Sequence, residues 1–375
     1  MAAARRKKSP PKSTSLAAAI KPRLRQAPAA ARKKRLGELT GEAAEAGVGD
    51  DLAKRLKQHD GLDSFLGSVL EYAPFLRGLM LQEPARLVAM LGEAPDAALE
   101  QSLSATSEAW RLDDQDDVMA VLRQQRQAVA LLVALCDLGG VWDVREVTAA
   151  LTAFADAATA AAARFALREA DRAGRLKLSD PDRPEEGSGW IILGMGKFGA
   201  GELNYSSDID LIVLYDETVA PLTDPDESAK TFIGMTKQLV QILSEHTSDG
   251  YVFRTDLRLR PDPGATNIAM STEGALQYYE SFGQNWERAA LIKARPVAGD
   301  KAAGESFLKE LVPYIWRKSL DYAAIADIHS IKRQIHAHKG GSTVAIEGHD
   351  IKLGRGGIRE VEFIAQAFQL IRGGR

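Results

Sequence analysis

The sequence contains a single cysteine, Cys136, among its 375 residues. One thiol cannot form an intrachain disulfide or build a zinc or iron–sulfur cage from cysteines, so these site classes are excluded. A chain without disulfides suits a reducing compartment, and we expect it to be cytoplasmic. No apolar run approaches the roughly 18 residues that a membrane-spanning helix needs. We therefore expect a soluble protein with no membrane partner.

Acidic residues are missing from positions 1–37, which hold 12 Lys or Arg. The remaining chain has 36 basic and 51 acidic residues, a formal charge of −15, although the whole chain carries only −3. A segment with four prolines and few branched or aromatic residues cannot bury itself, so it is predicted to be a disordered basic tail. Its composition also suits an organellar transit peptide or a nucleic-acid contact, without further support. The acidic remainder argues against nucleic acid as the main partner.

Composition along the chain indicates several domains, as its length also suggests. Residues 38–180 have apolar positions three and four residues apart and are predicted to form a helical domain. Polar residues 181–188, which include proline and glycine, are interpreted as a linker. Short apolar strands and helices over 189–300 predict an α+β catalytic core with a mixed β-sheet. Residues 301–375 return to helix, and we expect a longer protein to continue beyond them.

Three glycines, Gly194, Gly196 and Gly199, follow a short apolar strand with the spacing of a dinucleotide-binding loop. A Rossmann unit would place a whole helix before the next strand, but only eight residues separate Gly199 from Asp208. Lys197 is not followed by Ser or Thr, so a Walker loop is excluded as well. The glycines still predict a turn whose backbone N–H groups can meet a phosphate.

Two carboxylates, Asp208 and Asp210, stand at the head of the next apolar strand. Because side chains alternate along a strand, both should point to one face while Ile209 and Leu211 point to the core. Neighbouring carboxylates repel unless a cation lies between them, and hard oxygen ligands suit Mg²⁺ bound to phosphate. The alternative is a solvated acidic turn. We predict a site for two Mg²⁺ ions, with Asp256 as the third carboxylate ligand.

Asp256, Arg258 and Arg260 alternate along a further predicted strand over 251–260. They would share one face, so that a metal ligand and two phosphate-binding guanidiniums project together. A salt bridge between Asp256 and its own arginines is the alternative.

Several stretches together resemble one protein family. They are Gly194 to Leu203, Ser206 to Ile212 (SSDIDLI), Asp256 to Pro261 (DLRLRP), Trp286 to Arg295 and Ile351 to Phe363. In these stretches the chain is similar to the glutamine synthetase adenylyltransferase/adenylyl-removing enzymes of the nucleotidyltransferase superfamily. The resemblance covers about residues 60–375 and leaves out the basic tail.

The resemblance implies an enzyme with two catalytic halves, of which the N-terminal half removes AMP from glutamine synthetase and the C-terminal half attaches it. A helical segment before the glycine turn, a start at Met1 and the lack of a second Asp-x-Asp motif make us expect the adenylyl-removing half. The implied reaction is phosphorolysis, in which inorganic phosphate attacks adenylyl-tyrosine and ADP leaves. The implied catalytic and metal-binding residues are Asp208, Asp210 and Asp256, and the implied nucleotide- and phosphate-binding residues are Gly194, Gly196, Lys197, Ser206, Ser207, Arg258, Arg260, Lys293 and Arg295.

The partners that the resemblance implies are glutamine synthetase, the PII signalling protein, inorganic phosphate and ADP or ATP. Three other functions stay open at this point: AMP transfer from ATP to glutamine synthetase, a catalytically idle module that binds PII, and template-independent nucleotide addition to RNA. The three aspartates argue against an idle module, and the acidic body argues against RNA. Lys352 and Arg359 flank a glycine-rich turn that could bind an anion or form a tight corner.

Overall fold

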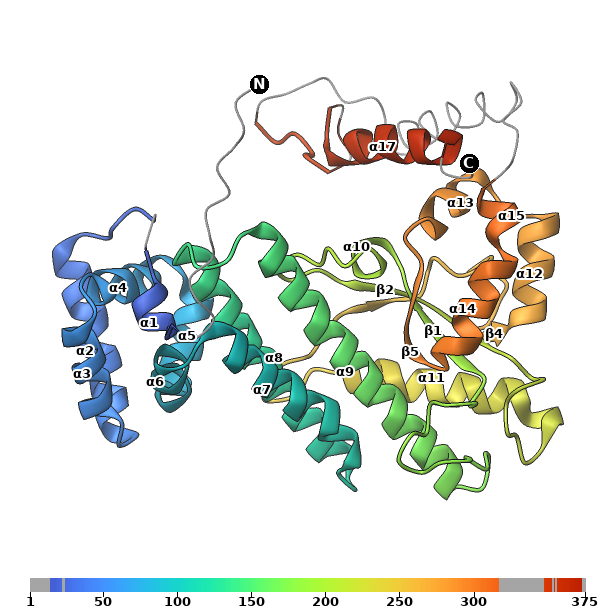
Figure 1. Cartoon of the computed structure of the whole chain (residues 1–375), viewed down its shortest axis with the longest axis horizontal. Helices are drawn as coiled ribbons and strands as arrows, with labels where there is room; N and C mark the ends of the chain where they lie inside the picture. The colour runs from blue at the N-terminus through green and yellow to red at the C-terminus, as the bar shows by residue number, and fades with distance from the viewer. Residues whose placement is uncertain (1–13, 22–23, 317–346, 353, 355, 373–375) are drawn as a thin grey trace. The chain divides into compact units, whose positions relative to one another are not determined.

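The structure is a computed structural model that describes residues 14–21, 24–316, 347–352, 354 and 356–372 (Figure 1). These residues form many helices and a mixed five-stranded sheet, which confirms the predicted α+β class. The elements up to residue 172 are α1 (Leu16–Ala19), α2 (Ala29–Glu45), α3 (Gly49–Gln58), α4 (Leu62–Tyr72), α5 (Pro74–Gln82), α6 (Pro84–Gly92), α7 (Pro95–Glu108), the 3₁₀ turn η1 (Ala109–Arg111), α8 (Gln115–Leu138) and α9 (Val144–Arg172). The later elements are β1 (Trp190–Gly194), α10 (Gly196–Gly199), β2 (Ile209–Tyr215), η2 (Pro225–Glu227), α11 (Ser228–Ser244), β3 (Thr255–Asp256), β4 (Met270–Ser271), α12 (Thr272–Ser281), α13 (Asn285–Leu291), β5 (Arg295–Gly299), α14 (Lys301–Glu310), α15 (Val312–Ile315) and α17 (Ile358–Arg372).

The chain divides into two compact units, and each is built from several separate segments. The first unit comprises Met1–Ala162, Gly201–Ser207 and Ile242–Arg254, and the second comprises Ala163–Ala200, Asp208–Gln241 and Thr255–Arg375. The chain therefore passes repeatedly from one unit to the other. The consecutive domain bounds predicted at 38–180, 181–188, 189–300 and 301–375 stay a prediction.

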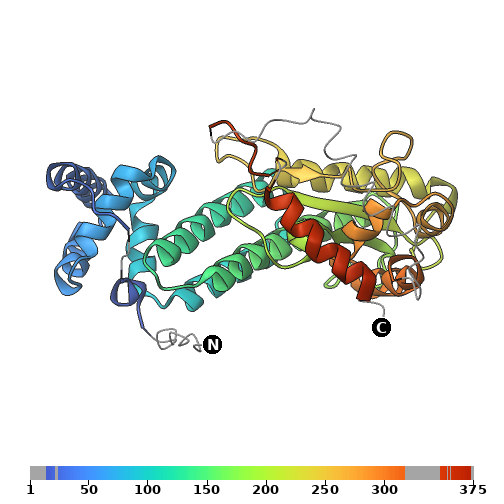
Figure 2. The ribbon, with the colours of Figure 1, turned by 90° about the horizontal axis from the view of Figure 1, so that it is seen from above.

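The short helices of the first unit, α1 to α6, gather into one cluster in both Figure 1 and Figure 2. Their apolar faces share a core that includes Leu39, Leu66 and Leu87, each with no exposed surface. Proline begins α5, α6 and α7, where its missing N–H leaves no intrahelical bond unmade. Burial of these apolar faces gives marginal short helices most of their stability.

The structure corrects the prediction of a disordered basic segment for residues 14–21 and 24–37. Leu16 in α1 is completely buried in the helical core. Arg35 in α2 forms an ion pair with Glu71 of α4 at 2.7 Å. The apolar and acidic partners of this segment come from other helices, so its own composition cannot reveal them. The rest of the predicted tail lies outside the described residues.

Two helices, α8 and α9, are long and apolar enough to cross a membrane by length and composition alone. The fold buries 67% and 72% of their most apolar windows, respectively. Core helices of soluble proteins pass the same test, so this feature is weak evidence for a membrane span. Burial against other helices is sufficient to explain the apolar character of both.

The sheet lies in the second unit and has the strand order β3-β2-β1-β5, with β4 also pairing with β2. β1 is antiparallel to β2 and β5, whereas β2 is parallel to β3 and β4. Ile191 and Leu193 of β1 contribute to a core shared with α12 and α14. Tyr215 of β2 stacks on Phe232 of α11 at 4.7 Å between ring centroids. Helices lie on both faces of the sheet (Figure 1), which explains why β1 is buried along its whole length and β2 along nearly all of it.

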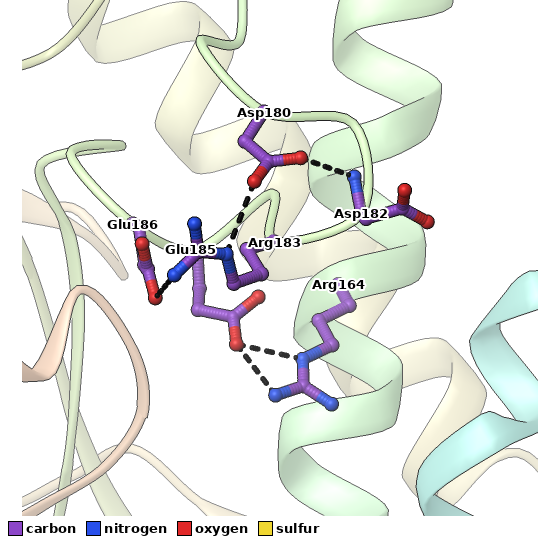
Figure 3. A network of polar contacts seen from close by, with 6 residues as sticks. All are labelled: Arg164, Asp180, Asp182, Arg183, Glu185 and Glu186. Atoms are coloured by element: carbon purple, nitrogen blue, oxygen red, sulfur yellow. Dashed lines mark hydrogen bonds and ion pairs between the residues drawn. The ribbon is translucent and has the colours of Figure 1, made fainter.

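The predicted linker, residues 181–188, is held to α9 by charged side chains (Figure 3). Arg164 of α9 donates through its Nε to the carboxylate of Glu185 at 2.9 Å. Arg183 pairs with Asp180 at 3.0 Å. The segment is therefore a surface loop with defined local contacts.

Candidate active site

A tight glycine turn connects β1 to α10. Gly196 has φ +55°, and a Cβ added there would lie 2.9 Å from Oδ2 of Asp210. A Cβ on Gly199 would lie 1.9 Å from the backbone oxygen of Lys293. Both positions thus require glycine, because a side chain would strain the backbone at one and collide with main chain at the other. The turn lies directly against the strand that carries the paired carboxylates.

The head of β2 matches the predicted alternation. Ile209 and Leu211 are completely buried, whereas Asp208 is exposed and Asp210 is half-buried. The backbone oxygen of Asp210 accepts a hydrogen bond from the N–H of Met195 at 2.9 Å. The core side of the strand therefore holds the carboxylate side in place beside the glycine turn.

Asp210 is the electrostatic centre of the site. Its pKa is raised, first by burial and then by repulsion from Asp256 and Asp208. The positive charges of Lys352 and Arg359 partly oppose this rise in the pKa of Asp210. Carboxylate oxygens are the donors that suit a hard divalent cation, and Asp210 is repelled by both of the others, so the chemistry of these three residues fits such an ion.

In the orientations that the structure shows, the carboxylates of Asp208, Asp210 and Asp256 do not enclose an ion. Within the described ranges, no group of three or more Asp, Glu, His or Cys side chains is arranged to hold a metal. Both carboxylate oxygens of Asp256 are hydrogen-bonded to Arg258. The predicted donors are near one another, and one of them is engaged by a cation from the protein itself.

The predicted strand over 251–260 is wrong for most of its length, because only Thr255–Asp256 forms a strand, β3. β3 runs parallel to β2 and pairs Asp210 with Asp256, the register that two ligands of one site require. Asp256 then accepts a hydrogen bond from the N–H of Arg258 at 2.8 Å. This local bond turns the chain away from the sheet, as aspartate side chains often do.

The alternative considered for Asp256, a salt bridge to its own arginine, is present. The Nε of Arg258 lies 3.0 Å from both carboxylate oxygens of Asp256, and one terminal nitrogen lies 2.5 Å from Oδ2. These bonds lower the pKa of Asp256. The side chain of Arg258 is 84% exposed, so the pair is well solvated and contributes little stability. The guanidinium of Arg258 can therefore leave Asp256 at a small cost in free energy.

Arg260 points to different partners. Its terminal nitrogens donate to the backbone oxygens of Leu257, Pro263 and Thr266 at 2.9, 2.9 and 3.1 Å. The side chain therefore braces the turn that follows β3, and it does not share a strand face with Arg258. Its phosphate-binding role stays a prediction.

Other predicted phosphate ligands surround the glycine turn in the second unit. Lys197 lies exposed in α10, and Lys293 is half-buried just before β5. Arg295 donates to the backbone oxygens of Gly199 and Phe198 at 3.3 and 3.2 Å, which caps the end of α10. Arg295 thus stabilises the end of α10, and its contact with phosphate stays a prediction.

Ser206 and Ser207 belong to the first unit, immediately before Asp208 in the chain. Ser206 is exposed, and its backbone has φ +52°, in the left-handed region that serine seldom adopts. The preceding loop is tied down by a hydrogen bond from the N–H of Leu203 to Oγ1 of Thr152 at 3.2 Å. The serines' role in holding a nucleotide phosphate stays a prediction.

Sequence reasoning missed Arg254, which stands two residues before Asp256. One terminal nitrogen donates to the backbone oxygen of Ser206 at 2.6 Å, and the other donates to the hydroxyl of Tyr251 at 2.7 Å. The only sequence signal was its position next to the third carboxylate. The hydrogen bond to Ser206 spans 48 positions in the chain, so local pattern could not predict it.

Two buried arginines serve packing. Arg123 in α8 has no exposed surface and donates to the backbone oxygens of Gly250 and Ile242 at 2.8 and 3.1 Å. Arg288 in α13 donates to the backbone oxygens of Tyr314 and Ile315. Buried guanidiniums whose donors meet carbonyl groups hold segments of chain together and are not available to a substrate.

Two models of known protein families match this chain. The family model described as glutamate-ammonia ligase adenylyltransferase matches residues 64–310. A second model, described as GlnD PII-uridylyltransferase, matches residues 328–375, most of which lie outside the described residues.

Curated relatives named bifunctional glutamine synthetase adenylyltransferase/adenylyl-removing enzyme match most of this chain. The protein of Brucella suis biovar 1 (strain 1330) is 54% identical over 313 residues, which cover 83% of this chain and 32% of that protein. The protein of Rhizobium meliloti (strain 1021) is 53% identical over 332 residues, 87% of this chain and 34% of its own length. The protein of Mesorhizobium japonicum is 51% identical over 345 residues, which cover 92% of this chain and 35% of that protein. This chain spans about a third of the length of these relatives.

Proposed function

We propose, because this chain belongs to the glutamate-ammonia ligase adenylyltransferase family, that it removes AMP from the tyrosine of adenylylated glutamine synthetase by phosphorolysis. The observation that carries the proposal is the β2–β3 register, which sets Asp210 beside Asp256 next to the glycine turn. A nucleotidyl-transfer site needs such a group of carboxylates close to a phosphate-binding turn.

The aspartates Asp208, Asp210 and Asp256 would hold divalent metal, which we propose to be two Mg²⁺ ions. Burial and mutual repulsion make this carboxylate group costly by itself, which supports a cation as its partner. When bound, the ions would offset negative charge on the phosphoryl oxygens.

The cations of the site would bind the attacking phosphate. Arg258 is exposed and can exchange Asp256 for a phosphate when the carboxylate turns to a metal ion. Lys197, Lys293 and Arg295 surround the glycine turn, and Gly194, Gly196, Ser206 and Ser207 are proposed to hold the nucleotide phosphate. Guanidinium and ammonium groups reduce the repulsion between two phosphate anions as they approach.

The reaction balances without an oxidant or a further reactant. An oxygen of inorganic phosphate forms a bond to the phosphorus of AMP, and the bond from that phosphorus to the tyrosine oxygen breaks. ADP leaves, and the tyrosine oxygen takes up a proton. Phenols have a pKa near 10 and are better leaving groups than alkyl alcohols, so a strong general acid is not essential.

The proposed partners and cellular location follow from the proposed removal of AMP from glutamine synthetase. We propose adenylylated glutamine synthetase as the protein substrate, since the relatives are named for that enzyme. The PII signalling protein is proposed as a regulatory partner, supported by the match of residues 328–375. The reactants are cytoplasmic metabolites and proteins, which supports a cytoplasmic location.

AMP transfer in the opposite direction is the second candidate, because the relatives are named for both activities. The same carboxylates would serve either direction, so the two must be separated by assay. The chain is incubated with adenylylated glutamine synthetase and Mg²⁺, with and without inorganic phosphate, and a parallel reaction contains unmodified glutamine synthetase and ATP.

The expected result is ADP that forms only when phosphate is present. Free AMP without phosphate would indicate hydrolysis, and AMP attachment from ATP would assign the transferase direction. No turnover in any reaction would favour the catalytically idle module. Asp210→Asn serves as the inactive control.

A further inference from the structure

One side chain joins the two chain segments that lead into the carboxylate strands. Arg254 donates to the backbone oxygen of Ser206 at 2.6 Å. Ser206 stands two residues before Asp208, and Arg254 stands two residues before Asp256. The hydrogen bond therefore connects equivalent positions ahead of two proposed metal ligands.

The position that receives this bond is strained. Ser206 has φ +52°, whereas residues with a Cβ favour negative φ because of steric contact with the backbone. Such a conformation persists only when surrounding contacts hold it. The bond from Arg254 goes to the carbonyl of Ser206 itself, so it acts directly on the strained peptide.

Arg254 is itself oriented for this role. Its other terminal nitrogen donates to the hydroxyl of Tyr251 at 2.7 Å, and its guanidinium lies 5.8 Å from the centre of that ring. A planar guanidinium can make both hydrogen bonds in a fixed geometry, and an ammonium group cannot reproduce that arrangement.

The strand pairing begins immediately after this bond. Ile209 pairs with Thr255, and Asp210 pairs with Asp256. β3 has only two residues, so its own pairing with β2 gives little control over register. The bond between Arg254, one residue before Thr255, and Ser206, three residues before Ile209, would supply the missing control.

We infer that Arg254 is a positioning residue for the proposed metal site: its hydrogen bond to Ser206 holds the entries of β2 and β3 in the register that pairs Asp210 with Asp256. The inference rests on the proposed metal-binding role of these aspartates. It assigns Arg254 no contact with substrate. Arg254 is exposed, so its removal changes ligand geometry much more than it changes stability of the fold.

Binding of Mn²⁺ alone tests the inference without substrate turnover. Affinity is measured by water-proton relaxation or by electron paramagnetic resonance of free Mn²⁺, and the melting temperature is measured alongside. Arg254→Met should weaken Mn²⁺ binding about tenfold, a typical cost of losing a group that orients a metal ligand. Arg254→Lys can keep only one of the two hydrogen bonds and should weaken Mn²⁺ binding about threefold.

A second substitution separates backbone control from general damage. Glycine adopts positive φ without strain, so Ser206→Gly should recover most of the affinity that Arg254→Met loses. Arg111→Met is the matched control, because Arg111 also pairs with a nearby side chain and lies over an aromatic ring. This control should leave Mn²⁺ affinity unchanged.

The outcomes are distinct. Unchanged Mn²⁺ affinity in Arg254→Met, or an equal loss in the double variant with Ser206→Gly, overturns the role of Arg254. A fall in melting temperature that accounts for the loss of binding also overturns it. If the unsubstituted chain fails to bind Mn²⁺, or if Asp210→Asn binds it normally, the proposed metal site is wrong, whatever Arg254 does.

Discussion

β2 and β3 each carry part of the proposed metal site, but different interactions hold them. β2 has seven residues, pairs with β1, β3 and β4, and is buried along nearly all its length. β3 has two residues, pairs only with β2 among the described strands, and is only half-buried. The packed core therefore fixes Asp210, whereas short-range polar bonds fix Asp256. A site built in this way combines one rigid ligand with one that can change partner.

The largest effect on activity is expected from substitution of Asp210, the proposed metal ligand that the packed core holds. Asp210→Asn should lower phosphate-dependent AMP removal on the order of a thousandfold, because it removes a metal-binding charge. The melting temperature without metal should stay equal or rise, since the substitution relieves repulsion from Asp208 and Asp256. ADP release and thermal unfolding are the two measurements. Asp226→Asn, on the surface of the same unit, is the control.

A loss of melting temperature as large as the loss of activity would contradict this prediction. It would mean that the Asp210 side chain itself contributes to folding. The view that the packed core alone fixes Asp210 would then be wrong.

Truncation of a leucine to alanine should cost more stability in β2 than in the turn after β3. Leu211→Ala in β2 should reduce the free energy of unfolding by about 2–5 kcal/mol, since this leucine is completely buried. Leu257→Ala, directly after β3, should cost about 1 kcal/mol, because that side chain is only half-buried. Urea denaturation of both variants gives the comparison. Equal losses would show that the turn after β3 is as firmly packed as the sheet.

Arg258 tests whether Asp256 exchanges partners. Arg258→Gln should raise the KM for phosphate about tenfold, the loss of one charge-assisted hydrogen bond of roughly 1.4 kcal/mol. The same substitution frees Asp256 and should lower the Mg²⁺ concentration needed for half-maximal rate. Initial rates at varied phosphate and Mg²⁺ measure both effects. A higher Mg²⁺ requirement would argue that Arg258 assists the metal site and does not compete with it.

The smallest kinetic effect is expected from Arg260. Arg260→Gln should reduce the free energy of unfolding by about 1 kcal/mol, because three backbone oxygens lose a charged donor. The KM for phosphate should change less than in Arg258→Gln. If it rises equally, the guanidinium must leave the turn when phosphate binds, as the sequence pattern had suggested.

Local pattern was sufficient where neighbours in the chain determine the structure. The alternation around Asp208 and Asp210 and the turn at Gly196 both depend on residues close in sequence. The segment after β3 misled the same reasoning, because alternation of Asp256, Arg258 and Arg260 has the period of a strand. A hydrogen bond from the backbone of Arg258 to Asp256 produces a turn there instead.

By itself, the sequence determined the α+β class, the family, and the pairing of two carboxylates with a glycine turn, because these depend on local periodicity and on short motifs. Only the tertiary structure decided which cations are committed to packing, since Arg123 and Arg260 find their carbonyl partners through folding of the chain. It also placed Arg254 on Ser206 and Arg35 on Glu71. A charged side chain looks the same in a sequence whether it faces solvent, substrate or a distant backbone oxygen, and long-range packing selects among these.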